Sequence, residues 1–245
     1  MHARGAVAAD PPAATAPLTP TTGACAMTRT HLHVFDMDGT LLRGAGSVEL
    51  ARHLGTFEPA DRIEQAWLRG EITDVQFWER MLPLWADVSE AEIDAAFAAA
   101  AWMDGVREVF ADIRARGEHI AVISQSPHFF VRRLEGWGAH RTFGSDVVPN
   151  TPTRKERLLT LQHKVDITLA LLDELGITDR ECVAYGDSTS DTLLFARLPH
   201  SVGVNCTARL RESAAVCFEG DDLRGAYALG RQLLDGARAG RGCPA

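Results

Sequence analysis

Short apolar runs that end at polar or glycine-rich turns recur along this chain and predict buried strands. The runs that indicate strands are residues 31–35, 119–123, 182–185, 201–204 and 216–218. Between several of these runs, apolar residues recur every three or four positions, which is the spacing of the buried face of a helix. Strands that alternate with helices predict an α/β fold with a Rossmann-like parallel sheet.

Amphipathic helices are expected between and after these strands. They are predicted at residues 106–116, from Pro127 onward, and at residues 158–175, 192–198 and 223–234. Residues 143–153 carry several turn formers and predict a short β excursion or a loop. The chain from Gly236 to its C-terminus, residues 236–245, predicts a frayed tail.

The stretch between residues 44 and 102 differs from its surroundings, because its pattern predicts helices without strands. Residues suited to begin a helix are Ser47, Pro59, Thr73 and Ser89. Glu92 completes a capping box with Ser89. Four short helices predict a small inserted α-helical cap domain, whose aromatic residues are expected mainly to form its own core. The predicted domains are residues 44–102 for the cap, and residues 31–43 and 103–235 for the α/β core.

The amino-acid composition of the N-terminal segment differs from that of the rest of the chain. Residues 1–30 are rich in Ala, Pro and Thr, which predicts a disordered extension, and Met27 offers a second possible start of translation. No apolar run there resembles the h-region of a secretory signal. No later run approaches the roughly 18 apolar residues of a membrane span, so no membrane partner is expected.

Charge and cysteine content narrow the possible partners. The formal net charge is −8, from 25 basic and 33 acidic residues, and no dense block of Lys or Arg occurs. Nucleic acid is therefore not expected as a partner. The five cysteines are scattered and odd in number, which favours free thiols in a reducing cytoplasm.

Acidic residues follow two of the predicted strands. Asp36 and Asp38 come directly after the strand at residues 31–35, and they point to the same side if the strand continues. Asp187 and Asp191 follow the strand at residues 182–185. Because parallel strands end at one edge of a sheet, where ligands bind, these acids are expected to converge. For the first pair alone, a solvated Asp-rich turn is an equal alternative.

Convergence of these acids indicates a cation. Asp36, Asp187 and Asp191 carry three negative charges, which a divalent ion and Lys164 together would cancel. Oxygen-only ligands at a phosphate site suit Mg²⁺, whereas a purely structural acid cluster leaves the repulsion unexplained. Ser124 ends another strand before a predicted helix N-terminus, and this is a suitable place for an anion. Taken alone, Ser124 fits a helix cap better than an anion site.

Four motifs in order resemble those of the haloacid dehalogenase superfamily. They are Asp36-Met37-Asp38-Gly39-Thr40, Ser124, Lys164, and Gly186-Asp187-Ser188-Thr189-Ser190-Asp191. The resemblance spans Leu32 to about Phe218. A helical segment directly after the first motif resembles the phosphoserine-phosphatase-like branch, in which a cap is inserted at that point.

The resemblance implies phosphoryl transfer to a carboxylate, with hydrolysis of a small-molecule phosphomonoester. Asp36 would be the nucleophile, and Asp38 the acid that protonates the leaving alcohol and then activates water. The residues implied to bind the phosphoryl group are Thr40, Ser124, Gln125 and Lys164. The residues implied to hold Mg²⁺ are Asp36, Asp38 through its backbone carbonyl, Asp187, and Asp191 as a ligand or as an orienting group.

Two alternatives remain beside a phosphatase. The dehalogenase branch lacks the second aspartate, so Asp38 favours phosphate chemistry over carbon–halogen chemistry. A phosphomutase acting on a sugar phosphate uses the same two acids. A binding or regulatory protein could keep the fold without turnover, although intact Asp36 and Asp38 favour an enzyme.

Substrate choice is expected to lie in the cap. Phosphoserine phosphatases have a glutamate shortly after the first motif, where this chain has Ala45, and a cap arginine near the position of Met81. Both departures argue against phosphoserine. Arg43, Trp78 and Arg80 are predicted to line a pocket for a bulkier or less amino-acid-like ester. The pattern predicts no particular oligomeric state.

Overall fold

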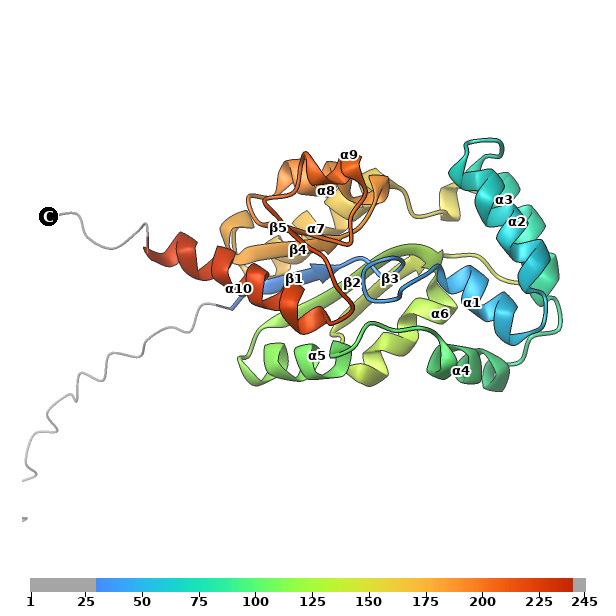
Figure 1. Cartoon of the computed structure of the whole chain (residues 1–245), viewed down its shortest axis with the longest axis horizontal. Coiled ribbons are helices and arrows are strands. Elements are labelled where there is room, and N and C mark those ends of the chain that lie inside the picture. The colour runs from blue at the N-terminus through green and yellow to red at the C-terminus, as the bar shows by residue number, and fades with distance from the viewer. Residues whose placement is uncertain (1–29, 240–245) are drawn as a thin grey trace, which may run out of the picture.

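A parallel sheet of six strands forms the centre of the molecule, and the sequence predicts five of them (Figure 1). The computed structural model describes residues 30–239, so the expectations for residues 1–29 lie outside the described part. The strands are β1 (Leu32–Phe35), β2 (His119–Pro127), β3 (Arg141–Ser145), β4 (Cys182–Gly186), β5 (Ser201–Val204) and β6 (Val216–Phe218). Their spatial order is β3-β2-β1-β4-β5-β6, and every neighbouring pair is parallel.

Strand β1 lies in the middle of this sheet. Leu32 and Val34 face one core cluster and Phe35 faces the other, because successive side chains of a strand point to opposite faces. The chain leaves β1 towards β2 and β3 on one side and returns through β4 to β6 on the other. In open α/β sheets such a reversal of strand order places a ligand-binding crevice at the carboxyl end of the central strands.

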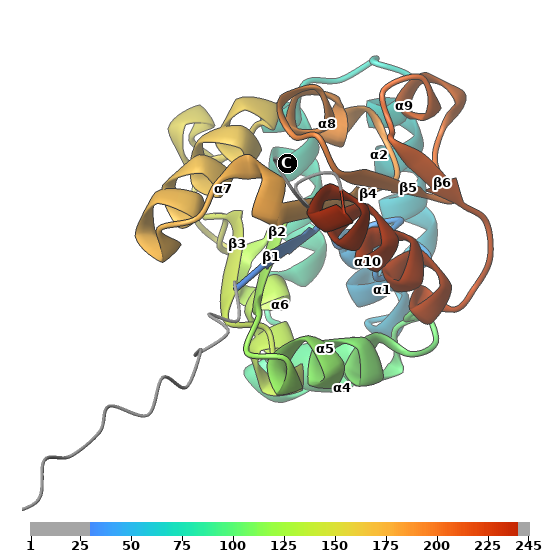
Figure 2. The ribbon, with the colours of Figure 1, turned by 90° about the vertical axis from the view of Figure 1, so that its left-hand side faces the viewer.

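Helices cover both faces of the sheet (Figures 1 and 2). The face with Val34 packs against α7 (Leu161–Leu175), α8 (Thr192–Arg197) and α9 (Ala208–Arg211). The opposite face packs against α5 (Val106–Ala115), α6 (His128–Val131) and α10 (Leu223–Ala239). Short 3₁₀ segments are η2 (Arg132–Trp137), η3 (Lys155–Arg157), η4 (Asp179–Glu181) and η5 (Thr189–Asp191).

Several predicted boundaries are wrong by a few residues. The strand expected to end at Ile123 continues to Pro127, where it pairs with Ser145 of β3 after a shift of register. The helix expected from Pro127 is therefore only the four residues of α6. Part of residues 143–153, left open between loop and strand, belongs to β3.

Two helix ends also differ from the prediction. Helix α7 begins at Leu161 rather than at residue 158, because Thr160 caps it and forms a capping box with His163. Helix α10 does not end at Leu234 but continues to Ala239. Ala and Arg follow Gly236 and are good helix formers, which outweighs the cost of one glycine. The rest of the expected tail, residues 240–245, lies outside the described part.

Residues between the first two strands form helices without a strand. They are α1 (Gly46–His53), α2 (Phe57–Leu68), α3 (Asp74–Met81), η1 (Leu82–Trp85) and α4 (Glu90–Ala99). The capping boxes of Thr73 with Gln76 and of Ser89 with Glu92 are present, whereas α2 begins two residues before Pro59. In Figure 1, α2 and α3 lie beyond the carboxyl ends of the strands, and α4 lies beside the layer of α5.

The aromatic side chains of this segment join the main core rather than forming a separate one. Phe77, Trp78 and Trp85 are buried and belong to the same cluster as Phe35 and Phe110. Arg133 of η2 also ties α4 to the core, through its Nε at 2.6 Å from Asp94. These contacts differ from the expectation of an independent cap core. The boundaries of the cap domain remain a prediction.

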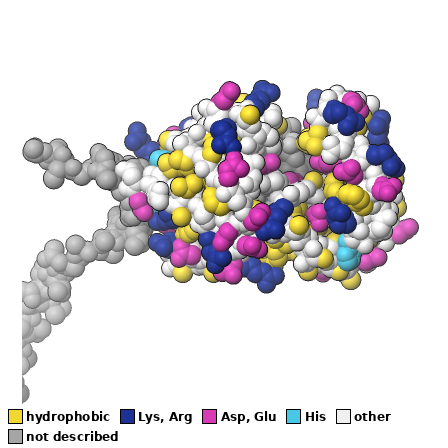
Figure 3. Space-filling model, viewed as in Figure 1, with side chains coloured by type: hydrophobic (Ala, Val, Ile, Leu, Met, Phe, Trp, Pro, Cys, Tyr) yellow, Lys and Arg dark blue, Asp and Glu magenta, His cyan; other side chains and the backbone are white. Residues whose placement is uncertain are grey.

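The state of the cysteines and the presence of membrane-spanning helices can be examined in the described residues. Cys182, Cys206 and Cys217 are free cysteines. Among residues 30–239, none of the helices combines the length and the apolar character needed to cross a lipid bilayer. On the face shown in Figure 3, basic and acidic side chains are interspersed.

Candidate active site

Three carboxylates meet where β1 and β4 end. Asp36 follows β1 directly, and its backbone N–H donates to the carbonyl of Tyr185 in β4 at 2.9 Å. This bond joins the two strand ends. One carboxylate oxygen from each of Asp36, Asp187 and Asp191 lies within 4.8 Å of the others. The convergence expected from the sequence is therefore present for these three acids.

Lys164 lies between two of these acids. Its Nζ is 3.0 Å from Oδ2 of Asp36 and 2.7 Å from Oδ1 of Asp191, and the side chain is 1 % exposed. Burial lowers the pKa of Lys164, but the charges of Asp191 and Asp36 outweigh this and raise it above its ordinary value. The lysine therefore stays cationic. It lies in the first turn of α7, which the Thr160 cap positions over the strand ends.

Asp36 combines burial with an opening to solvent. Its Oδ1 accepts a hydrogen bond from the Met37 backbone N–H at 2.7 Å, and its Oδ2 accepts from Ser190 Oγ at 3.3 Å. The side chain also lines a cavity. Burial raises the pKa of Asp36, Lys164 lowers it, and the neighbouring carboxylates raise it further, so that the pKa lies well above its ordinary value.

Asp191 lies behind the other acids. It is 1 % exposed and its Oδ2 accepts hydrogen bonds from the backbone N–H of Asp187 at 3.2 Å and of Ser188 at 3.4 Å. A Cβ on Gly186 would lie 2.4 Å from the Asp191 Cγ, so only glycine fits at that position. These contacts fit an orienting residue that holds the Asp187 turn.

Asp187 is the acid with spare coordination capacity. It lines the cavity, and its Oδ1 is buried without a hydrogen-bond partner among the described residues. Burial and the charge of Asp191 raise the pKa of Asp187 to about 7. Carboxylate oxygens that are buried and close together, one of them without a hydrogen-bond partner, fit a hard divalent cation such as Mg²⁺. Asp36 and Asp187, with Asp191 behind them, are the residues that could hold it.

The Asp38 side chain points away from this cluster. Its Oδ1 accepts from the Gly46 backbone N–H at 2.7 Å, and its Oδ2 accepts from Ser126 Oγ at 2.7 Å and Ser124 Oγ at 3.0 Å. Burial raises the pKa of Asp38, and these hydrogen bonds lower it only in part. The raised pKa favours the protonated form of Asp38, and its carboxylate is no member of the acidic cluster formed by Asp36, Asp187 and Asp191. Its backbone carbonyl as a metal ligand remains a prediction.

The three uncharged residues expected at the phosphate occupy different positions. Ser124 is fully buried and does not line the cavity, since its hydroxyl is used by Asp38. Thr40 is also fully buried, and its Oγ1 has no hydrogen-bond partner among the described residues. Gln125 does line the cavity, with its Nε2 donating to the Leu159 carbonyl at 3.1 Å. Their roles at a phosphate remain predictions.

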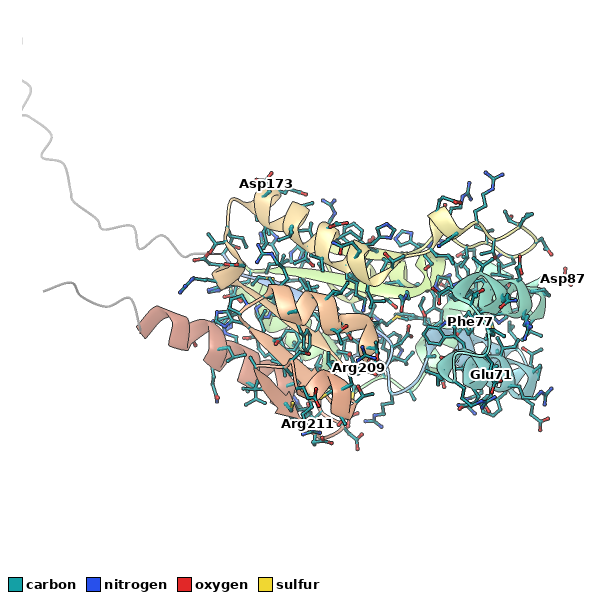
Figure 4. The ribbon with its side chains drawn as sticks, turned by 90° about the horizontal axis from the view of Figure 1, so that it is seen from above. Glu71, Phe77, Asp87, Asp173, Arg209 and Arg211 are labelled. Carbon is teal, nitrogen blue, oxygen red and sulfur yellow. The ribbon has the colours of Figure 1, made fainter. Side chains whose placement is uncertain are left out.

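A cavity of about 770 Å³ lies between the strand ends and the helical segment. Arg43 and Trp78 line it, as the sequence predicts, but Arg80 does not: its side chain is exposed on the other side of α3. The prediction for Arg80 is wrong because a shift of two positions along a helix turns a side chain to a different face. Phe77 lines the cavity and lies on the side of the helical segment nearer the core, whereas Asp87 lies on its outer side (Figure 4).

Sequence reasoning missed three residues at this site. Ser126 lines the cavity and donates to Asp38, and its position two residues after Ser124 on an extended chain was the available signal. Ser190 lines the cavity and donates to Asp36 from within the last motif. Glu64 of α2 lines the cavity as well, and nothing in its local sequence distinguishes it from a solvated helix acid.

The fold and this arrangement of acids define a class of protein. Residues 33–196 match the family described as haloacid dehalogenase-like hydrolase, and the chain belongs to that family. This confirms the resemblance seen in the four motifs.

Curated relatives with sequences similar to this chain include phosphoserine phosphatases. The chain is 26 % identical over 199 residues to the phosphoserine phosphatase of Archaeoglobus fulgidus, covering 79 % of this chain and 58 % of that protein. It is 24 % identical over 198 residues to the phosphoserine phosphatase of Methanocaldococcus jannaschii, covering 79 % and 94 % respectively. This chain therefore spans little more than half of the first relative and nearly all of the second.

Solved structures show the same fold. A substrate-bound phosphoserine phosphatase complex superimposes with a TM-score of 0.67 at 23 % identity, over 80 % of this chain and 96 % of that chain. A HAD family hydrolase from Salmonella enterica superimposes with a TM-score of 0.68 at 21 % identity, over 76 % and 66 % respectively. These likenesses confirm the α/β fold with helices inserted after the first strand.

Proposed function

We propose that the protein is a Mg²⁺-dependent phosphatase that hydrolyses a small-molecule phosphomonoester through an aspartyl-phosphate intermediate. The observation that carries this proposal is the position of Asp36. Its carboxylate opens to a cavity, is paired with a buried lysine, and lies within 4.8 Å of the oxygens of two further acids. Such an arrangement supports a carboxylate nucleophile whose charge is balanced at the site.

Two residues would carry the two displacements. In the first, a carboxylate oxygen of Asp36 attacks phosphorus, the bond to the leaving oxygen breaks, and Asp38 gives that oxygen its proton. In the second, ionised Asp38 takes a proton from a water molecule that attacks the same phosphorus, which releases phosphate and restores Asp36. The raised pKa of Asp38 suits the first step, because the acid must hold a proton before it can donate one.

Charge balance would come from fixed groups. Lys164 offsets the charge of Asp36 and of the transferring phosphoryl group, and Asp191 holds Lys164 in place. Ser190 and Gln125 supply hydrogen-bond donors at the cavity wall. A bound Mg²⁺ would withdraw charge from the phosphoryl oxygens, and Asp36 and Asp187 would hold it. Fixed donors and cations of this kind provide most of the catalysis of phosphoryl transfer.

The helical segment would act as a cap over this centre. We propose residues 44–102 as the cap and residues 31–43 and 103–235 as the core, with substrate specificity in the cap residues and in Arg43. The activity of a phosphoric monoester hydrolase agrees with the names of these relatives, and we propose the cytoplasm as its location. A phosphomutase or a protein without turnover finds no observation in its favour, since Asp36 and Asp38 are both intact and positioned.

Hydrolysis of p-nitrophenyl phosphate tests the proposal. We expect release of p-nitrophenol that needs Mg²⁺, is abolished by EDTA and returns when Mg²⁺ is added in excess. Asp36→Asn removes the nucleophile and should lower kcat by about 10³-fold or more. The matched control is Asp173→Asn, which changes an exposed acid at the far end of α7 (Figure 4). An Asp36→Asn rate equal to that of the control would overturn the mechanism.

A further inference from the structure

Two acids of the helical segment, Glu64 and Asp74, line the cavity wall, and neither has an ion pair with a basic side chain among the described residues. Glu64 of α2 lines the cavity, and the Oγ of buried Ser47 donates to its Oε2 at 3.3 Å. The charged groups acting on Glu64 are Asp38 and Asp61, both of them acidic. Burial, with these charges, raises the pKa of Glu64 to about 7. An acid in these surroundings gains most from a cation brought by the substrate.

Aromatic side chains surround the same part of the cavity. Trp67, Phe77 and Trp78 all line it, with ring centroids 5.6 Å apart for Trp67 and Phe77 and 4.7 Å apart for Phe77 and Trp78. A hydrogen bond of 2.7 Å from Trp67 Nε1 to Asp74 holds the indole ring of Trp67 in place. Aromatic faces attract ammonium groups and attract carboxylates poorly. The wall beside Glu64 therefore favours a positive charge.

Among the described residues, the cavity wall offers no free cation for a second anionic group of the substrate. Lys164 is buried between Asp36 and Asp191. Among the described residues that line the cavity, Arg43 is the only arginine, and it already contacts Asp104 and Asp221 at 3.5 Å each. A substrate carboxylate would therefore compete with two acids for Arg43 and would lie near the negative charge of Glu64.

We infer that Glu64 is a specificity-determining residue that binds an ammonium group on the alcohol of the substrate, and that the preferred esters are amino-alcohol phosphates without a carboxylate. This inference rests on the proposed phosphatase activity and deepens it. The phosphate would lie at Asp36, and the ammonium group would lie between Glu64 and the aromatic wall. The acid comes from α2, whereas the position after the first motif, Ala45, has no charge.

Three esters with similar leaving groups test the inference on the wild-type enzyme. They are ethanolamine phosphate with an ammonium group, propyl phosphate with a methyl group in its place, and phosphoserine with an added carboxylate. We expect kcat/KM for ethanolamine phosphate to exceed that for each of the others by about tenfold or more, because a hydrogen-bonded buried charge pair discriminates by that amount.

The variant Glu64→Gln keeps the shape of the side chain and removes its charge. It should lower the ratio of kcat/KM for ethanolamine phosphate to kcat/KM for propyl phosphate by about tenfold or more, mainly through a higher KM for the ester that carries the ammonium group. Glu58→Gln is the control, since it makes the same change at an exposed position of α2.

The outcomes separate this inference from the proposed function. If p-nitrophenyl phosphate is not hydrolysed by the wild type, the phosphatase proposal fails first. If it is hydrolysed but phosphoserine or propyl phosphate is the better ester, the assignment of Glu64 is wrong. Equal losses of Glu64→Gln on charged and uncharged esters would also overturn the assignment, because they indicate a structural role.

Discussion

At the scale of single residues, the two acids of the first motif have been given opposite surroundings. The Asp36 carboxylate faces a lysine and two carboxylates, whereas the Asp38 carboxylate faces two hydroxyls and a backbone N–H. Burial raises both pKa values, so the pKa alone does not separate the two acids. The difference is Lys164, whose Nζ is 3.0 Å from Asp36 and favours the ionised form that a nucleophile needs, whereas the partners of Asp38 are uncharged donors.

Asp38→Asn tests that division. The amide cannot donate a proton as an acid or accept one from water, so alkyl phosphates should lose about 10²–10⁴-fold in kcat. With p-nitrophenyl phosphate, whose leaving group needs little protonation, the first displacement should persist. We therefore expect a burst of p-nitrophenol close to one equivalent per enzyme, followed by slow turnover, in a stopped-flow measurement. The absence of a burst, with equal losses for both kinds of ester, would contradict the assignment of Asp38.

At the scale of elements, the turn after β1 brings its backbone close to the turn after β4. Gly39 has φ of +74°, and a Cβ there would lie 2.2 Å from Oδ2 of Asp187. Both constraints require glycine. The close approach also explains how Asp36 and Asp187, which are distant in sequence, form one site. Because Gly39 has no side chain, nothing at that position holds Asp187 away from the first motif.

Gly39→Ala should therefore disable the cation site. Gly117→Ala is a matched control, since Gly117 has φ of +71° but nothing within 4 Å of an added Cβ. Both variants should lose about 1–2 kcal/mol of unfolding free energy from backbone strain, measured by urea denaturation. Gly39→Ala alone should also raise the Mg²⁺ concentration for half-maximal activity by tenfold or more. Equal Mg²⁺ dependence in the two variants would show that Asp187 does not require the close approach.

At the scale of the whole molecule, a buried charge network joins the start of β1 to the C-terminal helix, far from the acids at the other end of the strand. Glu118 accepts hydrogen bonds from Arg231 of α10 at 2.6 and 2.7 Å, and it contacts His31 at 2.7 Å and His33 at 3.0 Å. Burial raises the pKa of Glu118, but its hydrogen bonds outweigh this and hold the pKa well below its ordinary value. Burial also lowers the pKa of His33.

This network predicts loss of stability in acid. Both pKa values are lowered in the folded state, so the stabilisation is present above the unfolded values and is lost as pH falls below about 6.5 for His33 and about 4.3 for Glu118. Urea denaturation should show the unfolding free energy falling through this range. At pH 7, Glu118→Gln should lower it by about 3–5 kcal/mol, since it leaves Arg231 without its buried partner.

The control for this network is an exposed ion pair. Glu174 contacts Arg141 at 3.1 Å with both side chains more than half exposed. Glu174→Gln should therefore cost about 1 kcal/mol or less and leave the pH dependence unchanged. A Glu118→Gln protein as stable as Glu174→Gln would show that the network contributes little.

The sequence by itself determined the α/β class, the strands and the acids that end them. These properties follow from local sequence. The alternation of side chains along a strand decides to which face of the sheet Asp36 points, and parallel strands end at the same edge of the sheet. Capping boxes at Thr73 and Ser89 are local as well, but they do not place the helices that follow them in space.

Only the tertiary structure decided how the site is divided among its residues. It buried Asp191 behind Asp187, turned Arg80 out of the cavity, and brought Ser126 and Glu64 into it. The periodicity of a helix shows which residues share a face, but it does not show what that face packs against. The packing partner depends on how the helix lies over strands that are distant in sequence. The chemistry of Asp36 could thus be predicted from a motif, whereas the charge that Glu64 presents to the substrate follows from the position of α2 over the strand ends.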